Sequence, residues 1–437
     1  MNTGYKKFML VLGVLLTLCV VTPWAASSEE GTKGHDDAYR ELELFTDVLA
    51  LIQRNYVEEV ELKDLIYGAI DGMLATLDPH SAFMPPEEYA ERRVDTQGAF
   101  GGLGLEVTIR DGLLTVVSPI DDTPAYRAGL QAGDQILRIE KRSTKSLDIM
   151  DAVQLMRGEP GTVVTIIIMR EDFEKPQEYK LTREVIKIAS VKARTLSGGV
   201  GYARLMQFQE QTAQDLKKSL KRLREENDGV LKGLVLDLRN NPGGLLDQAI
   251  QVSDLFIDQG LIVYTEGRDE ESRISSSATS EGTEPHYPIV VLLNAGSASA
   301  SEIVAGALHD HERALLLGER SFGKGSVQTL MPLGDDSGLS LTTARYFTPN
   351  GTSIQATGIE PDIIVPQAEL VVRKHAQFRE QDLNNHILNG DAEEKPARSG
   401  EDPRLTPEDL QDYQLMRALD LLQGWGVFRQ YQPPLQG

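Results

Sequence analysis

The spacing of apolar positions changes along the chain and divides it into three regions. In residues 38–95, apolar residues such as Leu44 and Val48 recur at the interval of one helical face, which predicts an N-terminal helical region. Residues 98–186 contain short runs of alternating apolar and polar positions broken by glycine turns, as in a small α+β domain. In residues 190–370, short apolar runs alternate with amphipathic segments, which predicts an α/β core. The expected fold is therefore multidomain, with α+β and α/β parts.

The two ends of the chain differ from these regions. Lys6 and Lys7 precede the apolar run Phe8–Val21, and small residues follow, which is the order of an export signal. Residues 1–27 are expected to be a signal peptide or, if it is not cleaved, a signal anchor, although the apolar run is short for a membrane-spanning helix. Residues 371–437 are polar apart from a final amphipathic segment, which predicts a linker and a C-terminal helix that docks back.

Composition narrows the possible functions. With 437 residues the chain is too long for one ordinary core, and 66 acidic against 44 basic residues give a net charge of −22. Such a surface repels phosphate backbones, so nucleic-acid binding is not expected. Cys19 is the one cysteine of the sequence and lies in the export segment, which excludes disulfides and thiol catalysis in the mature chain. An exported chain of this kind suits the bacterial periplasm or the periplasmic face of the inner membrane.

The densest chemical pattern is the run Asn294–Glu302, which follows an apolar, strand-like segment and precedes a helical one. It contains Ser297, Ser299 and Ser301. A turn of small residues from strand to helix exposes a hydroxyl and directs the first free N–H groups of the helix toward whatever that hydroxyl attacks. Serine needs a neighbouring base, however, and a serine-rich helix start is usually only a cap. The residues alone leave the choice among the three serines open.

Lys324 is the strongest candidate for the base. Glycines on both sides let the backbone close around its amine, and burial beside Phe322 would favour the neutral amine, which accepts a proton. Gln328 offers an acceptor that could orient this amine. A lysine in this setting therefore predicts general-base chemistry.

Histidine and nucleotide chemistry are the alternatives. His309 and His311 lie about ten residues, or roughly 15 Å along a helix, from the serines, which is too far for proton transfer. A solvated helix end explains this pair better than a metal site. The spacing from Gly318 to Lys324 approaches that of a phosphate-binding loop, but Gly325 stands where serine or threonine would hold magnesium. Neither a metal nor a nucleotide is expected.

The run from Asp237 to Gly244 reads Asp-Leu-Arg-Asn-Asn-Pro-Gly-Gly and ends a buried strand in a glycine pair. Glycines can present amide N–H groups at close quarters. Together with the amide of Ala300, this pair would form an oxyanion hole for a tetrahedral intermediate. A plain turn is the alternative.

The glycine cluster that opens the small α+β domain suggests peptide binding. Its successive amides suit a terminal carboxylate, and the strand that follows offers an edge for an added peptide strand. The residues expected to contact such a peptide are Gly102, Leu103, Gly104, Leu105 and Val107. Apolar side chains on this strand favour partners with apolar C-terminal residues. Glycines that only shape a tight turn are the alternative.

Three motifs in this order resemble those of the carboxyl-terminal processing proteases, which are tail-specific serine peptidases with a Ser/Lys dyad. They are Asp-Leu-Arg-Asn-Asn-x-Gly-Gly, Gly-Ser-Ala-Ser-Ala-Ser-Glu and Phe-Gly-Lys-Gly-x-Val-Gln, and the likeness covers residues 40–370. The resemblance implies that Ser299 is the nucleophile, Lys324 the general base and Gln328 its orienting partner.

The same resemblance assigns the rest of the site. It places the oxyanion donors at Ala300 and Gly244, and it makes residues 98–186 a PDZ domain inserted before the peptidase core. The family often has glycine where this chain has Pro242, a change that removes one N–H group but not the glycine pair.

The resulting expectation is an extracytoplasmic serine endopeptidase that recognises protein C-termini through a PDZ domain and works without a cofactor. Its partners would be protein or peptide substrates with apolar C-termini. The N-terminal segment would allow membrane association, and homo-oligomers or an activator protein fit an enzyme that rests closed. The alternative is a catalytically silent PDZ-based binding or scaffold protein of the cell envelope. Such a scaffold has no reason to keep Ser299, Lys324 and Gln328 together.

Overall fold

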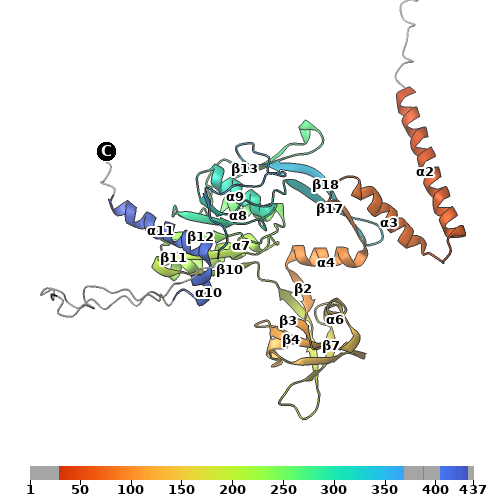
Figure 1. Cartoon of the computed structure of the whole chain (residues 1–437), viewed down its shortest axis with the longest axis horizontal. Helices are drawn as coiled ribbons and strands as arrows, with labels where there is room; N and C mark the ends of the chain where they lie inside the picture. The colour runs from red at the N-terminus through yellow and green to blue at the C-terminus, as the bar shows by residue number, and fades with distance from the viewer. Residues whose placement is uncertain (1–28, 369–386, 388–403, 432–437) are drawn as a thin grey trace, which may run out of the picture. The chain divides into compact units, whose positions relative to one another are not determined.

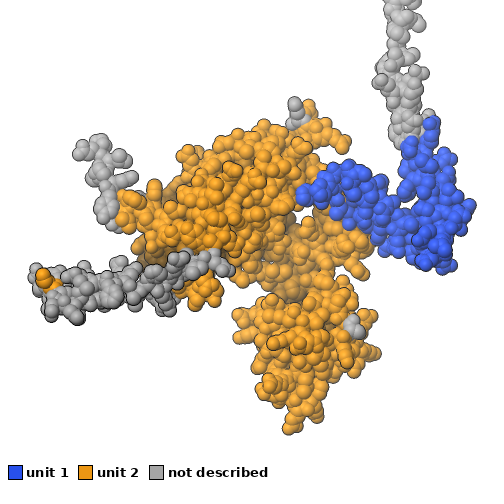
Figure 2. Space-filling model, in the orientation of Figure 1, with its two compact units in different colours: residues 1–83 blue, residues 84–437 orange. Residues whose placement is uncertain are grey.

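The computed structural model describes residues 29–368, 387 and 404–431, and the chain divides into two compact units, Met1–Phe83 and Met84–Gly437 (Figure 2). The expected signal segment and nearly all of the expected linker lie outside the described residues. Within the described ranges, no helix is both long enough and apolar enough to cross a membrane. The expected combination of α+β and α/β parts is confirmed.

The first unit is helical. It consists of α2 (Glu29–Asn55) and α3 (Leu62–Ala75), and the rings of Tyr67 and Phe83 lie 4.6 Å apart. The apolar residues that predict α2 remain largely exposed, with Leu44 at 59%. The helical pattern continues into the second unit as α4 (Pro86–Gln97), which the left-handed residue Gly98 ends.

The small domain of the second unit is a curved antiparallel sheet with short helices. Its main strands follow the order β3 (Leu105–Arg110), β4 (Leu113–Pro119), β5 (Gln135–Ile139), β7 (Val163–Met169) and β8 (Gln177–Thr182). The remaining elements are α5 (Pro124–Arg127), β6 (Arg142–Ser143) and α6 (Ile149–Met156). Alternating residues of β7 are fully buried, among them Ile166 and Ile168, so the period of two places every second side chain in the core.

A separate two-stranded ladder connects this domain to the rest of the unit. Strand β2 (Ala99–Gly102) pairs antiparallel with β9 (Glu184–Lys187), so the segments that enter and leave the domain run side by side. The sequence analysis described a glycine cluster here and expected a strand only after it. It therefore missed β2, because glycine has low strand propensity.

The centre of the second unit is a six-stranded sheet. Its order is β10 (Val191–Thr195), β11 (Val200–Leu205), β12 (Gly233–Asp237), β15 (Ile289–Leu293), β16 (Leu315–Gly318) and β19 (Ile363–Ile364). All pairs are parallel except β10 with β11. Every residue of β12 and β15 is buried, as expected for parallel strands covered on both faces.

Helices cover both faces of this sheet. On one face Leu234 and Val291 pack in a core with α7 (Thr212–Glu225), α8 (Leu246–Asp254) and α9 (Ala300–Asp310). On the other face Val235 and Leu292 pack against α11 (Tyr413–Tyr431) (Figure 1). The predicted C-terminal helix therefore exists and docks back on the sheet.

A second, antiparallel sheet flanks the centre. In it β18 (Gly338–Phe347) pairs with β17 (Ser326–Pro332) and with β13 (Leu261–Glu266), and β13 pairs with β14 (Ile274–Ser277). Strand β17 begins two residues after Lys324, so this sheet holds the chain that carries the predicted base.

Charged groups fasten the C-terminal segment to the sheet. The guanidinium of Arg239, directly after β12, donates two hydrogen bonds to Asp237 and two, of 2.7 and 2.8 Å, to Asp412, between α10 (Pro407–Gln411) and α11. Burial opposes ionisation of Asp412, but the hydrogen bonds and charge of Arg239 outweigh it and lower the pKa of Asp412 below its ordinary value. Arg194 of β10 pairs with Asp409 of α10.

Replacing Asp412 tests this attachment. Asp412→Asn is expected to lower the free energy of unfolding by about 2 kcal/mol, because a charge-assisted pair becomes a weaker neutral contact. Since the folded-state pKa of Asp412 is depressed, its contribution is complete above the unfolded-state value and is lost as the pH falls through the folded-state value. Urea unfolding at several pH values should therefore show a difference between the two proteins that shrinks on acidification below about 4.

A matched control is Asp420→Asn, which removes an exposed carboxylate that pairs with Arg417 on the same helix. This change should cost well below 1 kcal/mol. Equal losses in both variants, or a difference that grows at low pH, would contradict the attachment.

Candidate active site

The three predicted motifs meet because each follows a neighbouring strand of the parallel sheet. The loop 238–244 follows β12, the turn 294–299 follows β15 and the segment 319–325 follows β16. These strands are adjacent in the order β12-β15-β16. The carboxyl ends of parallel strands open at one edge, where such sheets bind ligands.

The serine-rich turn separates its three hydroxyls. Ser297 and Ser301 are fully buried, and their hydroxyls donate to backbone carbonyls, that of Ser297 to Leu238 at 2.8 Å and that of Ser301 to Asn241 at 2.9 Å. Ser299 instead lines a cavity and stands at the N-cap of α9. The structure thus gives Ser297 and Ser301 a structural role and presents Ser299 to the cavity.

The backbone of Ser299 has an unusual conformation. Its φ of 56° lies in the left-handed region, which a residue with a side chain rarely adopts. Strain of this kind persists only where the surroundings hold it, and it often marks a functional position. Here it turns the side chain out of the strand-to-helix connection and into the cavity.

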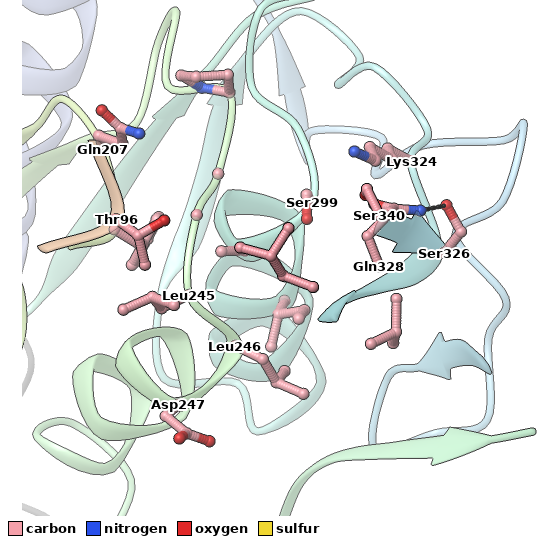
Figure 3. A pocket seen from close by; sticks show the side chains of 18 of the residues that line it. Thr96, Gln207, Leu245, Leu246, Asp247, Ser299, Lys324, Ser326, Gln328 and Ser340 are labelled. Carbon is pink, nitrogen blue, oxygen red and sulfur yellow. Dashed lines mark hydrogen bonds between the residues drawn. The ribbon is translucent and has the colours of Figure 1, made fainter. Parts of the chain in front are cut away.

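The cavity has a volume of about 490 Å³ and brings the predicted residues together (Figure 3). Figure 3 shows Ser299 and Lys324 on facing walls, with the lysine amine directed toward the serine side. The lining includes all three motifs: Pro242, Gly243, Gly244, Ser299, Ala300, Lys324 and Gln328, together with the apolar residues Leu246, Ile303, Val327, Leu330 and Tyr346.

A buried carboxylate connects the serine turn with the lysine segment. Glu302 in the first turn of α9 is fully buried. Its oxygens accept hydrogen bonds from the backbone N–H groups of Ser299 at 2.8 Å, Gly323 at 2.7 Å and Lys324 at 2.9 Å. They also accept the hydroxyl of Ser321 at 2.6 Å. One side chain therefore fixes the backbone of both predicted catalytic residues.

The glycines beside Lys324 are required by close packing. A Cβ atom at Gly325 would lie 2.5 Å from the backbone nitrogen of Gln355, well inside contact distance. The N–H group of Gly325 in turn donates to the side-chain oxygen of Gln355 at 3.0 Å. These contacts hold the loop that presents Lys324. Phe322, which was expected to bury the amine, is itself 62% exposed.

The glycine pair after β12 packs directly against the serine turn. A Cβ atom at Gly243, whose φ is 101°, would lie 2.8 Å from Cβ of Ser299 and 2.9 Å from the nitrogen of Ala300. The N–H group of Gly243 donates to Oδ1 of Asn241 at 2.9 Å. Asn241 accepts the N–H of Ala298 through its backbone carbonyl, so loop and turn are joined.

Two backbone N–H groups beside Ser299 are free to donate a hydrogen bond to a ligand. Among the described residues, no acceptor binds the N–H group of Gly244 or of Ala300. Both residues line the cavity beside Ser299. Pro242 is exposed at its rim, and the glycine pair keeps its contact with the serine turn despite this departure from the family motif.

Gln328 lies on β17 and also lines the cavity. Its amide nitrogen donates to the hydroxyl of Ser326 at 2.9 Å (Figure 3). It also donates to the hydroxyl of Thr342 at 3.2 Å. These bonds use the amide nitrogen, so the amide oxygen is the atom with which Gln328 can accept a hydrogen bond from a lysine amine.

The residues predicted to bind peptide lie at the start of the small domain's sheet. Gly102 ends β2, and the side chain of Leu103 is buried in the domain core, so only its backbone can meet a ligand. Gly104 turns the chain with a φ of 76°. Leu105 and Val107 lie on β3, which is an end strand and, among the described residues, pairs only with β4. An open strand edge is therefore present.

The sequence analysis did not assign roles to Glu302 or Tyr346. For Glu302 a signal exists, because Ser-x-x-Glu at a helix start is the spacing of a capping box. The carboxylate does accept the Ser299 N–H as in such a box, but it also reaches the lysine segment, which local spacing cannot reveal.

Comparisons with known proteins identify the family. The profile of peptidase family S41 matches residues 199–365, that of a PDZ domain residues 115–170, and that of the activating protease CtpB N-terminal domain residues 21–88. A carboxy-terminal-processing protease of Bartonella bacilliformis is 44% identical over 422 residues, which cover 96% of each chain.

More distant relatives carry similar names. The carboxy-terminal processing protease CtpB of Bacillus subtilis is 37% identical over 77% of this chain and 70% of its own. Among solved structures, a photosystem II D1 C-terminal processing protease is 31% identical and covers 74% of this chain and 92% of its own, with a TM-score of 0.43.

Glu302→Gln tests the connecting carboxylate. Glutamine has the same shape, but its NH₂ group would face N–H donors in place of an acceptor oxygen. The misaligned serine and lysine segments are expected to lower kcat by about 100-fold, measured on an unstructured protein substrate. Glu225→Gln, on the exposed side of α7, is the matched control and should leave kcat unchanged. A folded Glu302→Gln protein with the original kcat would contradict this role.

Proposed function

Because the chain belongs to the carboxy-terminal processing proteases of peptidase family S41 and is therefore a serine-type peptidase, we propose that it cuts with a Ser299–Lys324 dyad and selects substrates by their C-termini. The observation that supports the dyad best is the shared carboxylate. Glu302 accepts the backbone N–H groups of both residues, and both side chains line one cavity.

The reaction then proceeds through an acyl-enzyme. The neutral amine of Lys324 takes the proton of the Ser299 hydroxyl as Oγ attacks the substrate carbonyl. The tetrahedral intermediate collapses when the C–N bond breaks and the lysine ammonium gives its proton to the leaving amine. Water repeats the sequence on the ester: Lys324 accepts a proton from the water and returns one to Oγ of Ser299. Gln328 holds the lysine amine from β17.

The amides of Gly244 and Ala300 form the proposed oxyanion hole. They lie beside Ser299, and no residue in the described part of the chain accepts a hydrogen bond from them. Ala300 opens α9, whose first amides carry a partial positive charge. Donors aimed at the developing negative charge stabilise the transition state more than the ground state. Pro242 and Gly243 shape this loop but donate no hydrogen bond to the oxyanion. Proline has no N–H group, and the N–H group of Gly243 already donates to Asn241.

The PDZ domain supplies selectivity in this proposal. A substrate's last residues add a strand to the open edge of β3, with the terminal carboxylate at the amides of residues 102–104. Leu105 and Val107 are partly exposed on β3, and they favour apolar C-terminal side chains.

The proposed site of action is outside the cytoplasm, at the bacterial periplasm or the periplasmic face of the inner membrane. The charged, apolar and small-residue order of the first 27 residues supports export or membrane association through this segment. Regulation by an activator protein is in keeping with the match to the activating protease CtpB N-terminal domain. Homo-oligomerisation remains part of the proposal, because the apolar residues of α2 are exposed.

The dyad is tested with Ser299→Ala and Lys324→Ala on an unstructured protein that ends in an apolar residue. The wild-type protein is expected to cleave it, with a rate that rises with pH because only the deprotonated amine accepts the serine proton. Each variant should lose at least about 1,000-fold in kcat. Measuring kcat and KM across pH with each protein checks this, with circular dichroism to establish that the variants fold.

The same substrate with an amidated C-terminus tests recognition of the C-terminus separately from the Ser299–Lys324 dyad. Amidation should raise KM and leave kcat nearly unchanged if the PDZ domain binds the carboxylate. A Lys324→Ala variant as active as the wild type would remove the dyad. Binding of the free-carboxylate substrate without cleavage by any of the three proteins would favour the silent PDZ scaffold.

A further inference from the structure

Tyr346 lies among the residues of the proposed dyad, although none of the three motifs includes it. It is the ninth residue of the ten-residue strand β18, only 1% of its surface is exposed, and it lines the same cavity as Ser299 and Lys324. Its backbone N–H donates to the carbonyl oxygen of Gly325 at 3.0 Å, which attaches it directly beside Lys324. Its ring packs in the core cluster that also contains Ala300 and Ile303.

The hydroxyl of Tyr346 is an unusual buried group. It is shielded from solvent, and no hydrogen bond of normal geometry joins it to a described residue. Tyr346 and Ser299 line the same cavity, and the backbone of Tyr346 is bonded to Gly325, the residue after Lys324. A buried donor without a partner destabilises a fold, and phenylalanine would fill the same space without this cost. The hydroxyl therefore does not stabilise the resting protein.

The ionisation of this phenol limits what it can do. Burial, and then the negative charge of Glu302, raise the pKa of Tyr346 well above its ordinary value, against an opposing effect of Ser299. The phenol therefore keeps its proton at any pH at which the protein works. It can donate a hydrogen bond to a reacting oxygen, but it cannot serve as the base.

We propose that Tyr346 is a further catalytic residue, whose hydroxyl donates a hydrogen bond to Oγ of Ser299 as that oxygen gains negative charge. This proposal depends on the dyad proposed above. Ser299 Oγ gives its proton to Lys324 and forms a bond to the substrate carbonyl carbon, while the phenol keeps its own proton throughout. A serine oxygen can donate to one neighbour and accept from another, so lysine and tyrosine do not compete for it.

The same contact assists the second half of the reaction. When water has attacked the ester, the bond from the carbonyl carbon to Oγ breaks and Oγ again carries negative charge until Lys324 returns a proton. A donor that stays in place stabilises this charge in both steps without reorganisation. No described residue pairs with the hydroxyl in the resting enzyme, which leaves it available for this task.

Tyr346→Phe removes the hydroxyl and nothing else. We expect kcat on the unstructured protein substrate to fall roughly 10- to 100-fold, with KM changed by less than about twofold, because the lost contact forms as charge develops. The melting temperature should stay the same or rise, since the lost hydroxyl has no hydrogen-bond partner in the part of the chain that the structure describes. The shape of the pH–rate profile should also stay the same, because the phenol does not titrate.

Tyr287→Phe is the matched control. Tyr287 is another buried tyrosine of the same core, but its hydroxyl donates to Glu284 at 2.9 Å and it does not line the cavity. This variant should melt at a lower temperature and keep the wild-type kcat. The pair of variants thus separates loss of stability from loss of catalysis.

A Tyr346→Phe protein with unchanged kcat would overturn the proposal. A changed pH profile would also overturn it, because the phenol would then act as a titrating group. A loss of kcat matched by an equal loss in Tyr287→Phe would reduce Tyr346 to a packing residue. The dyad is judged separately: if Lys324→Ala keeps the wild-type rate, the dyad fails whatever Tyr346→Phe does.

Discussion

The carboxylate of Glu302 is the contact on which the rest of the site depends. It has no exposure to water and accepts four hydrogen bonds, three of them from backbone N–H groups on two segments that follow different strands. Hydrogen bonds to a buried charge are stronger than those between neutral groups, and their loss would leave several buried groups unpaired. This arrangement holds the strained conformation of Ser299 and the loop of Lys324 in one geometry, with no need for a direct covalent or metal link between them.

The parallel sheet explains why these segments are neighbours at all. β12, β15 and β16 lie side by side, so the loop 238–244, the serine turn and the lysine segment leave the sheet at one edge. The antiparallel sheet then adds Gln328 from β17 and Tyr346 from β18 to the cavity lining. On the opposite face of the sheet, Arg239 donates to Asp412 and so attaches the C-terminal segment to the start of the loop 238–244.

Much of this could be predicted from the sequence, because the controlling signals are local. Apolar runs and glycine turns predict β12, β15 and the strands of the PDZ domain. The serine turn and the Gly-Lys-Gly segment predict the site. The matches to the family models confirm the peptidase core and the PDZ domain. What could not be predicted depends on contacts between residues far apart in the chain. The hydrogen bonds from Gly323 to Glu302 and from Arg239 to Asp412 follow no periodicity or motif. The prediction of Ser299 rather than Ser297 or Ser301 rests on the resemblance, and the burial of the other two serines is consistent with it.

The most direct test is to locate the acyl group on the enzyme. The protein would be mixed with an activated ester of a short peptide, quenched in acid, digested and sequenced by mass spectrometry. The account predicts one acyl group per chain, on Ser299, and none on the Lys324→Ala protein quenched at the same time. An acyl group on Ser297 or Ser301, or acylation of Ser299 at an unchanged rate without Lys324, would contradict it.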